Sequence, residues 1–391
     1  MPAANIVVIE VGLAIGLILL LVDPVLWPGS VGVAALALII ALLRRRGRWF
    51  TQWFGLVLEY RSRNHSRVSE PAAAVEGEEP EDDNVIGPEN NRVSLLRLTV
   101  EDLVVARSQD HNRNPVGMAW HDGAWTAVLM VEPAPSLLNE VGKQPNLPLS
   151  VLTPCLEDRG VVLDAIQVIW HCYPGGALPS DSPALNSYME VLGPLPAAAR
   201  RTTWVAVRLD PQQCPKAVGE RGGGVVGAQR ALIGALSRVR NALERHDVPT
   251  RPLDPDELLQ AGISSAELQE MLGSERPVAL KERWNSVTAG RIGHSSYAIT
   301  GWPNQMNNSL NALTGVRALS SSIALSISPS GEDDEVGLRG LVRVSARTPE
   351  ELDAADERLR GLSNRLGVTL TPLRGRQLAG LTATLPLGGA A

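Results

Sequence analysis

Three short stretches of the chain contain residue types that could carry chemistry. They are the glycine-rich segment 219–231, the adjacent pair His171-Cys172 and the acidic run 332–335. Such patterns can hold a pyrophosphate, a thiol nucleophile with its base, and a divalent cation, respectively. Whether any of them forms a site depends on the elements that position it.

The glycine-rich segment GERGGGVVGAQRA contains Gly222, Gly224 and Gly227 in the spacing of a dinucleotide-binding fingerprint, and it opens an expected helix. A pyrophosphate would bind at the N-terminus of such a helix. However, the preceding strand is expected to end at Asp210, and PQQCPKAVGER intervenes where the fingerprint needs a tight turn. The context favours a flexible glycine loop over a cofactor site. No GxxxxGK[ST] motif occurs in the chain, so we expect no cofactor.

The other two stretches also favour a structural interpretation. His171 and Cys172 follow a predicted strand, and adjacent strand residues point to opposite faces, which is the wrong geometry for a catalytic pair. The acidic run 332–335 lies in a predicted turn, where a solvated loop is the simpler explanation than ion binding. The six histidines and three cysteines lack metal-ligand spacing, so we predict neither a metal site nor catalytic residues. Unpaired cysteine spacing also indicates a reducing compartment.

From residue 92 onward the pattern is that of a mixed α+β fold. Two apolar runs around Asp122-Gly123 predict a β-hairpin, and further strands are predicted at 161–173, 200–210, 282–289, 294–302, 320–328, 337–346 and 379–387. Helices are predicted at 225–246 and 348–366, and a third after a capping box formed by Ser264 and Glu267. No repeat of fixed period is visible. We expect two lobes, 92–250 and 251–391.

The first 48 residues predict a membrane hairpin. Two apolar runs, 6–22 and 31–43, are separated by turn residues, and each is long enough or nearly so to cross a bilayer. A signal peptide is a weaker alternative because its basic residues should precede the apolar run, and a re-entrant hairpin also stays open. Glu10 lies near the start of the first run, where we interpret it as interfacial, although a carboxylate within a membrane often marks function.

Basic and aromatic residues follow this hairpin directly. They are Arg44, Arg45, Arg46 and Arg48, then Trp49, Phe50, Trp53 and Phe54. Basic residues beside a membrane helix stay in the cytoplasm, which predicts a multi-pass protein of the inner (plasma) membrane with both termini cytoplasmic. The aromatic residues fall on one face of a juxtamembrane helix, 49–68, suited to a lipid dock or a partner contact. A core helix of the following domain is the alternative.

A linker is predicted at 69–91, where SEPAAAVEGEEPEDDNVIGPENN is rich in acids and prolines and contains no base. The net charge of the chain is −6, and no basic stripe is present, which disfavours nucleic acid.

This layout resembles the EccE family, a core membrane component of the mycobacterial type VII (ESX) secretion system. The resemblance is carried by the helix pair, by RRRGRWFTQWF, and by the hairpin VGMAWHDGAWTAVLMVEP with Gly117, Asp122, Gly123 and Trp125. It implies a structural subunit without catalytic residues. It also implies partners, EccB, the EccC ATPase and EccD, in a six-fold assembly powered by EccC.

Two functions of other classes stay open at the level of sequence. A membrane-anchored glycosyltransferase would need an exposed Asp-x-Asp metal site, and neither the acid cluster EPEDD of the linker nor the run 332–335 has this form. A ligand-sensing regulatory module is the second alternative.

Overall fold

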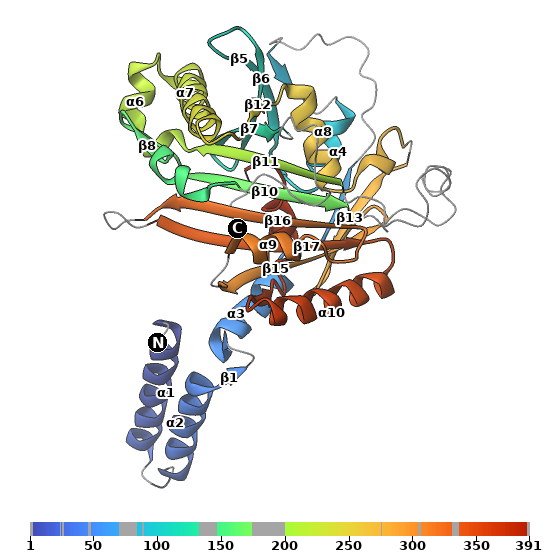
Figure 1. Cartoon of the computed structure of the whole chain (residues 1–391). Coiled ribbons are helices and arrows are strands. Elements are labelled where there is room, and N and C mark those ends of the chain that lie inside the picture. The colour runs from blue at the N-terminus through green and yellow to red at the C-terminus, as the bar shows by residue number, and fades with distance from the viewer. Residues whose placement is uncertain are drawn as a thin grey trace. The chain divides into compact units, whose positions relative to one another are not determined.

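The computed structural model describes residues 3–23, 25, 27–45, 48–69, 84–87, 90–132, 147–173, 200–274, 276–303, 306–330 and 336–388. The chain divides into two compact units at Asn64 and His65, and each is described by itself (Figure 1).

The first unit is helical. It contains α1 (Ala3–Val22), α2 (Trp27–Leu42) and α3 (Phe50–Ser62), with a pair of two-residue strands, β1 (Arg44–Arg45) and β2 (Arg48–Trp49), before α3. With 20 residues, α1 is about 30 Å long and apolar enough to cross a membrane, whereas α2 has 16 residues and is shorter.

Small residues bring α1 and α2 into close contact. A Cβ atom added to Gly12 would lie 2.1 Å from Cβ of Ala37, and one added to Gly16 would lie 3.2 Å from the carbonyl oxygen of Ser30. Because larger side chains would separate the backbones, these glycines explain why two almost uniformly apolar helices have one defined contact face.

One polar contact closes the end of this hairpin. The buried side chain of Asn5 donates from Nδ2 to the carbonyl oxygen of Ala41, 2.7 Å away, and its Oδ1 accepts a hydrogen bond from the hydroxyl of Thr51 in α3. The start of α1 is thereby connected to both α2 and α3.

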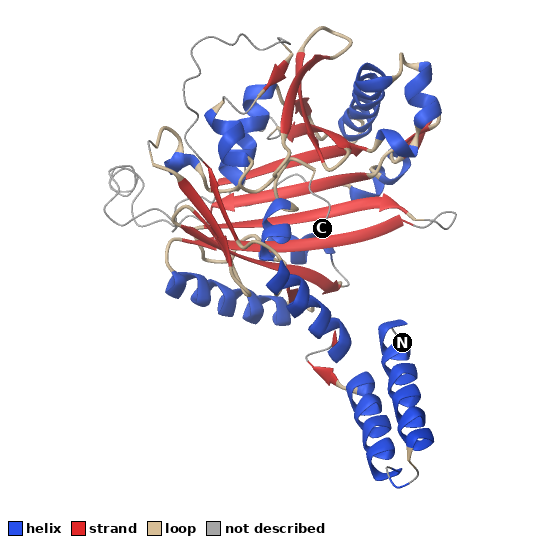
Figure 2. Ribbon diagram, turned by 180° about the vertical axis from the view of Figure 1, so that it is seen from behind, coloured by secondary structure: helices blue, strands red, loops and turns tan. Residues whose placement is uncertain are grey.

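The second unit is built on one antiparallel sheet, which has 14 strands in the described residues. Figure 2 shows this sheet crossing the domain. The strands that concern the site are β5 (Val104–Gln109), β6 (Pro115–His121), β7 (Ala124–Val131), β10 (Ala165–Tyr173), β11 (Arg200–Leu209), β12 (Thr250–Pro252), β13 (Val278–Glu282), β14 (Val287–Ala289), β15 (Ile292–Gly301), β16 (Ser320–Pro329), β17 (Val336–Ala346) and β18 (Thr369–Pro372). Two short strands, β3 (Ser66–Ser69) and β4 (Val85–Ile86), form its ends.

Both faces of this sheet are buried, because alternate residues of each strand enter one of two hydrophobic cores. The larger core includes side chains of α6 (Pro215–Glu220), α7 (Gly224–Glu244), α9 (Met306–Leu313) and α10 (Pro349–Arg365). The other core includes side chains of α4 (Asn91–Leu96), α8 (Pro255–Ser265) and α11 (Gln377–Thr382). Strands buried on both faces explain the nearly continuous apolar runs in the sequence.

The sheet consists of two halves with the same topology. In the first half the strand order is β5-β6-β7-β11-β10, with β12 added to β7. In the second half the order is β13-β14-β15-β17-β16, with β18 added to β15. The first half continues into α7, β12 and α8, and the second continues into α10, β18 and α11.

Details of register support this correspondence. The halves meet where β10 pairs antiparallel with β16, and Ile169 faces Ala324. His121 and Ala124 close the hairpin of the first half across a two-residue turn, as Ala289 and Ile292 do in the second half. The helices α7 and α10 are each followed by a residue of positive φ, Asp247 at 57° and Gly367 at 70°. The two halves are therefore related by an approximate two-fold axis, although no fixed sequence period marks them.

Most predicted elements are confirmed. The hairpin around Asp122-Gly123 and the strands at 320–328 and 337–346 are present, as are the helices predicted at 225–246 and 348–366, within a few residues at each end. The strand predicted at 282–289 is wrong in detail, because β13 ends at Glu282 and β14 begins at Val287.

Two predictions at helix boundaries are wrong. The capping box lies at Asp254 and Glu257, not at Ser264 and Glu267, because the helix begins at Pro255 and ends at Ser265. Glu267 follows that helix with a φ of 57° and takes a different role, described below. Residues 379–387 do not form the predicted strand, because they belong to α11 and to the turns that follow it, where Leu381 and Leu385 pack in the core on the sheet.

Most of the predicted linker, 69–91, lies outside the described residues, but it begins in β3, contains β4 and ends at the first residue of α4. Ser69 pairs with Val278 at one end of the sheet, and Val85 and Ile86 pair with β5 at the other. The juxtamembrane helix predicted over 49–68 is shorter, since α3 ends at Ser62. The two-lobe boundary at residue 250 stays a prediction, and the sheet runs through both parts.

Gly117 provides a test of how α8 packs on the first hairpin. A Cβ atom at this position would lie 2.7 Å from the carbonyl oxygen of Asp254 and 2.8 Å from the backbone of Pro255. We expect Gly117→Ala to lower the free energy of unfolding by about 1–3 kcal/mol, because backbone atoms must move apart. Gly234→Ala in α7 is the control, because nothing lies within 4 Å of a Cβ atom added there. This substitution should leave the free energy of unfolding unchanged or raise it. Equal effects of both changes on denaturant unfolding would contradict the packing described here.

Candidate functional site

On one face of the sheet, polar side chains are concentrated on the strands of the second half and on the adjoining strand β10. Alternate residues of β10, β15, β16 and β17 point to this face, and two neighbouring cross-strand rows are polar. One row is His171, Ser322, Arg343 and Ser296, and the next contains Ser320, Ser345 and His294 beside Tyr173. All of these residues except the partly buried Tyr173 are buried.

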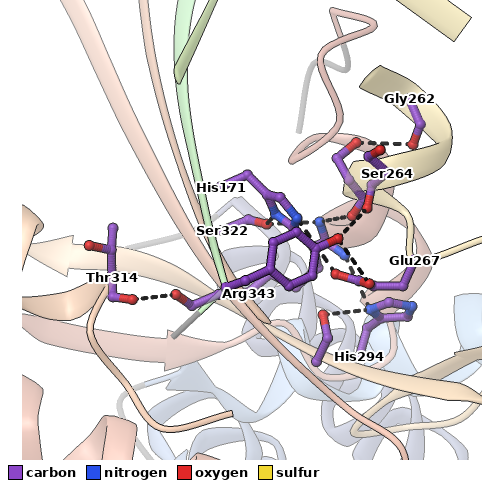
Figure 3. A network of polar contacts seen from close by, with 12 residues as sticks. His171, Gly262, Ser264, Glu267, His294, Thr314, Ser322 and Arg343 are labelled. Carbon is purple, nitrogen blue, oxygen red and sulfur yellow. Dashed lines mark hydrogen bonds and ion pairs between the residues drawn. The ribbon is translucent and has the colours of Figure 1, made fainter. Parts of the chain in front are cut away.

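Arg343 is the centre of this network (Figure 3). Its side chain has no exposed surface. Nη2 donates to the hydroxyl of Ser322, 2.9 Å away, and to the carbonyl oxygen of Ser265, while Nη1 lies 3.1 Å from Nδ1 of His294. Because Ser265 is the last residue of α8, the guanidinium sits at the negative end of that helix dipole. Burial lowers the pKa of Arg343 to about 10.

Glu267 supplies the opposite charge near Arg343. Its Oε1 lies 3.6 Å from Nε2 of His171, and its Oε2 accepts a hydrogen bond of 3.2 Å from the hydroxyl of Tyr173. Burial raises the pKa of Glu267, although Ser320 and Arg343 oppose this effect. Burial and the neighbouring carboxylate also raise the pKa of Tyr173. The positive φ of Glu267 is therefore the consequence of turning its side chain inward just after α8 ends.

Hydrogen bonds hold both histidine rings in place. Nδ1 of His171 lies 2.9 Å from the hydroxyl of Ser322, which also accepts from Arg343, and Nε2 of His171 faces Glu267. Nδ1 of His294 likewise accepts, with Arg343 at 3.1 Å and the Ser345 hydroxyl at 2.9 Å. Burial, and then the positive charge of Arg343, lower the pKa of His294 well below its ordinary value.

This network is closed to solvent, so its chemistry is structural. Ser322, Arg343 and His294 expose at most 1% of their surface. Cys172 points to the opposite face from His171, as predicted, and burial raises the pKa of its thiol. The network instead joins the two halves of the sheet, because Arg343 of the second half binds the end of α8, which follows the first half.

A second buried arginine fixes the hairpin turn to the C-terminal segment. Nε of Arg208 lies 2.7 Å from Oδ2 of Asp164, and Nη1 donates to the carbonyl oxygen of Gly388. The carboxylate of Asp122 lies 3.7 Å from Nη2, and Nε2 of His121 lies 3.4 Å from Nη1. Burial and Arg208 together lower the pKa of His121. The HDG turn is thus part of a structural clamp.

The glycine-rich segment does not have the arrangement of a dinucleotide site. Strand β11 is antiparallel to both of its neighbours, and α6 separates it from α7, so no βαβ unit exists here. Gly223 and Gly224 have φ values of 69° and 55°, and Gly227 packs against the carbonyl of Val218. These glycines allow the tight connection between α6 and α7. The acidic run 332–335 lies outside the described residues.

The basic residues predicted to set orientation are only partly described. Arg44 and Arg45 form β1, and Arg48 is in β2, whereas Arg46 lies outside the described residues. The guanidinium of Arg44 stacks over the ring of Trp49, 4.8 Å from its centroid.

The aromatic residues form a continuous surface on the first unit. Phe50 and Trp53 are in contact, with ring centroids 5.7 Å apart. Phe54 and, one turn later, Leu58 expose 56% and 60% of their surface. No residue of α3 is fully buried within the described part of the chain.

The buried roles of Arg343, Glu267, His294 and Arg208 were not predicted from the sequence. A signal was present in SSSIALSIS and GLRGLVRVSA, where polar residues alternate with apolar ones in strands that otherwise appear fully buried. Alternation predicts a separate face, but it does not say that a helix end covers that face and buries it.

The buried histidine makes stability depend on pH. The folded pKa of His294 lies below its unfolded value, so its contribution is present above about pH 6.5 and is lost as the pH falls below it. We expect the free energy of unfolding to decrease by about 1.4 kcal/mol per pH unit there. Glu267, whose folded pKa is raised, acts in the opposite direction. Denaturant unfolding at pH 7.5 and 5.5 measures the sum.

His294→Gln separates these two effects. Glutamine can accept the hydrogen bond from Arg343 and cannot be protonated, so the variant should lose less stability than the wild type between these pH values. His246→Gln is the matched control, because His246 is exposed. The assignment fails if both variants show the pH dependence of the wild type.

Comparison with known proteins places these features in a family. The family model described as "Putative type VII ESX secretion system translocon, EccE" matches residues 197–299, which run from β11 to β15. The chain is 27% identical over 293 residues to ESX-5 secretion system protein EccE5 of Mycobacterium marinum, covering 70% of this chain and 65% of that protein.

Two further relatives are ESX-1 secretion system proteins named EccE1. The protein of Mycobacterium tuberculosis H37Rv is 23% identical over 232 residues, covering 57% of this chain and 42% of that protein. The protein of Mycolicibacterium smegmatis is 36% identical over 64 residues, or 16% of this chain and 14% of that protein. The chain thus spans less than two thirds of each relative. These similarities support the assignment of the chain to the EccE family.

Proposed function

We propose that this chain is a structural subunit of a type VII (ESX) secretion membrane complex. The observation that carries the proposal is its similarity to ESX secretion system proteins over 70% of its length. The closed network around Arg343 agrees with a scaffold role, because its buried histidines and glutamate make contacts that hold the two halves of the sheet together. We propose no enzymatic activity.

The first unit would insert as a two-helix hairpin. In support, α1 and α2 expose aliphatic side chains along their length and keep small or polar residues for their mutual contact. The shorter α2 is about 24 Å long, so it would need flanking residues or a local thinning of the bilayer to span it. Arg44, Arg45, Arg46 and Arg48 would then hold its end in the cytoplasm, together with both termini and the second unit.

Single cysteines can test this topology. Ser30 and Ser69 are poor positions for labelling because both are buried. Val25 exposes 77% of its surface in the connection between the helices, and His246 is exposed on the second unit. The native cysteines are buried, so they should give little background. We expect an impermeant maleimide to label Val25→Cys from outside intact cells and His246→Cys only after lysis. The reverse pattern would exclude the proposed orientation.

The aromatic surface of Trp49, Phe50, Trp53 and Phe54 would dock this subunit on a partner or in the lipid headgroup layer. The two apolar helices are sufficient to insert the protein in the membrane, so the aromatic side chains are not needed for anchoring. Each large apolar side chain that becomes buried contributes about 1.5–3 kcal/mol, and tryptophans are frequent hot spots of interfaces.

Replacing Trp49 and Trp53 with Ser should leave the protein in the membrane and weaken its hold on the complex, with a parallel fall in secretion. Native gels of mild detergent extracts would show the subunit separating from the other components, for which EccB, the EccC ATPase and EccD are the proposed partners. Gln52→Ala and Arg61→Ala provide the control, because both side chains are exposed on the same helix. Normal migration and secretion of the double variant would refute the docking role, and its loss from the cell would favour a core helix.

We also propose the predicted boundaries as working domains: a hairpin at 1–48, the juxtamembrane segment 49–68, the acidic segment 69–91, and lobes at 92–250 and 251–391. The two-fold correspondence of the sheet supports a division into two lobes, with β12 and α8 still belonging to the first half.

A further inference from the structure

A cavity of about 220 Å³ lies on the same face of the sheet as the polar network, one row of residues further along the strands. Its floor consists of β10, β15, β16 and β17, and Leu373 and Ala383 of the C-terminal segment also line it. It is only partly open to the surface.

The cavity exists because the two halves of the sheet carry side chains of different size at corresponding positions. One cross-strand row runs over six strands and contains, in order, Met130, Trp204, Ile169, Ala324, Leu341 and Ala298. The first three belong to the first half and fill their side of the row with large side chains. The last three belong to the second half and include two alanines, and all three line the cavity.

One edge of this apolar floor is polar. Gln167, Ser326 and Arg339 form the adjacent row, and each of them lines the cavity. Gln167 exposes only 4% of its surface. Its Nε2 donates to the carbonyl oxygen of Ala383, 2.6 Å away, whereas its Oε1 has no hydrogen-bond partner among the described residues. A buried acceptor without a donor is destabilising, and a bound donor would compensate for this loss.

We infer that this cavity is a binding site for a small neutral molecule with an apolar body and a hydrogen-bond donor, an alcohol or a primary amide, as its polar head. The head faces Gln167 and Ser326, and the body lies on Ala298, Ala324 and Leu341. The volume is sufficient, since an apolar cavity of about 150 Å³ accepts benzene. This activity is additional to the proposed scaffold role and does not depend on it.

Benzyl alcohol and toluene are suitable probes because they differ mainly in the donor group. The full-length protein in detergent is labelled with ¹³C at alanine methyl groups, so that Ala298, Ala324 and Ala383 report on the cavity and the buried Ala231 in the other core serves as the control. We expect benzyl alcohol to shift the three cavity signals saturably and to leave Ala231 unchanged. Toluene should bind about fivefold more weakly, the ratio that one hydrogen bond of about 1 kcal/mol gives.

Two variants test the assignment further. Gln167→Leu should bring the affinity for benzyl alcohol to that for toluene. Ala298→Leu should fill the cavity and abolish the shifts at Ala324 and Ala383 without lowering the melting temperature. Shifts that do not saturate, or that include Ala231, would overturn the site, as would a high-resolution structure with only water in the cavity at saturating benzyl alcohol. Equal affinities for the two probes in the wild type would overturn the role of Gln167. The titration of the wild type decides these points even if a variant fails to fold.

Discussion

The second unit depends on how it accommodates one fully buried positive charge. Removing the guanidinium of Arg343 from water is costly, and the surrounding structure must compensate with hydrogen bonds and negative potential. It does so with a serine hydroxyl, a neutral histidine, a helix C-terminus and a carboxylate in the vicinity. None of these groups lies next to another in sequence. The requirement therefore fixes the position of α8 on the sheet and the inward turn of Glu267, and it keeps His294 neutral.

The approximate two-fold arrangement shows where the two halves have diverged. The first half uses large side chains, such as Trp204 and Met130, to fill its part of the sheet face. The second half has alanines, serines and charged residues at the corresponding strands, and these create both the polar network and the cavity. The fold is thus symmetric in topology and asymmetric in chemistry. The specific features of this protein lie mainly in the second half and at the line where the halves meet.

The first unit follows a different physical rule. Its helices expose apolar side chains and bury small ones, which suits a surrounding bilayer in which close backbone contact, and not the hydrophobic effect, holds helices together. In the second unit, apolar side chains are inside and both sheet faces are covered. This reversal of pattern within one chain is the structural observation on which the proposed membrane anchor rests.

The sequence by itself determined the elements whose signals are local. Apolar runs with turn residues between them predicted α1 and α2, Asp122-Gly123 predicted the hairpin, and Pro349 with its acidic first turn predicted α10. It also disfavoured a dinucleotide site at the glycine-rich segment, because the spacing to the preceding strand was wrong. Only the tertiary structure decided that Arg343, Glu267 and His294 meet, that residues 377–382 form a helix and not a strand, and that the sheet has two corresponding halves. These facts depend on register and burial between strands far apart in sequence, and a strand's alternating pattern shows that it has two faces without specifying what covers either one.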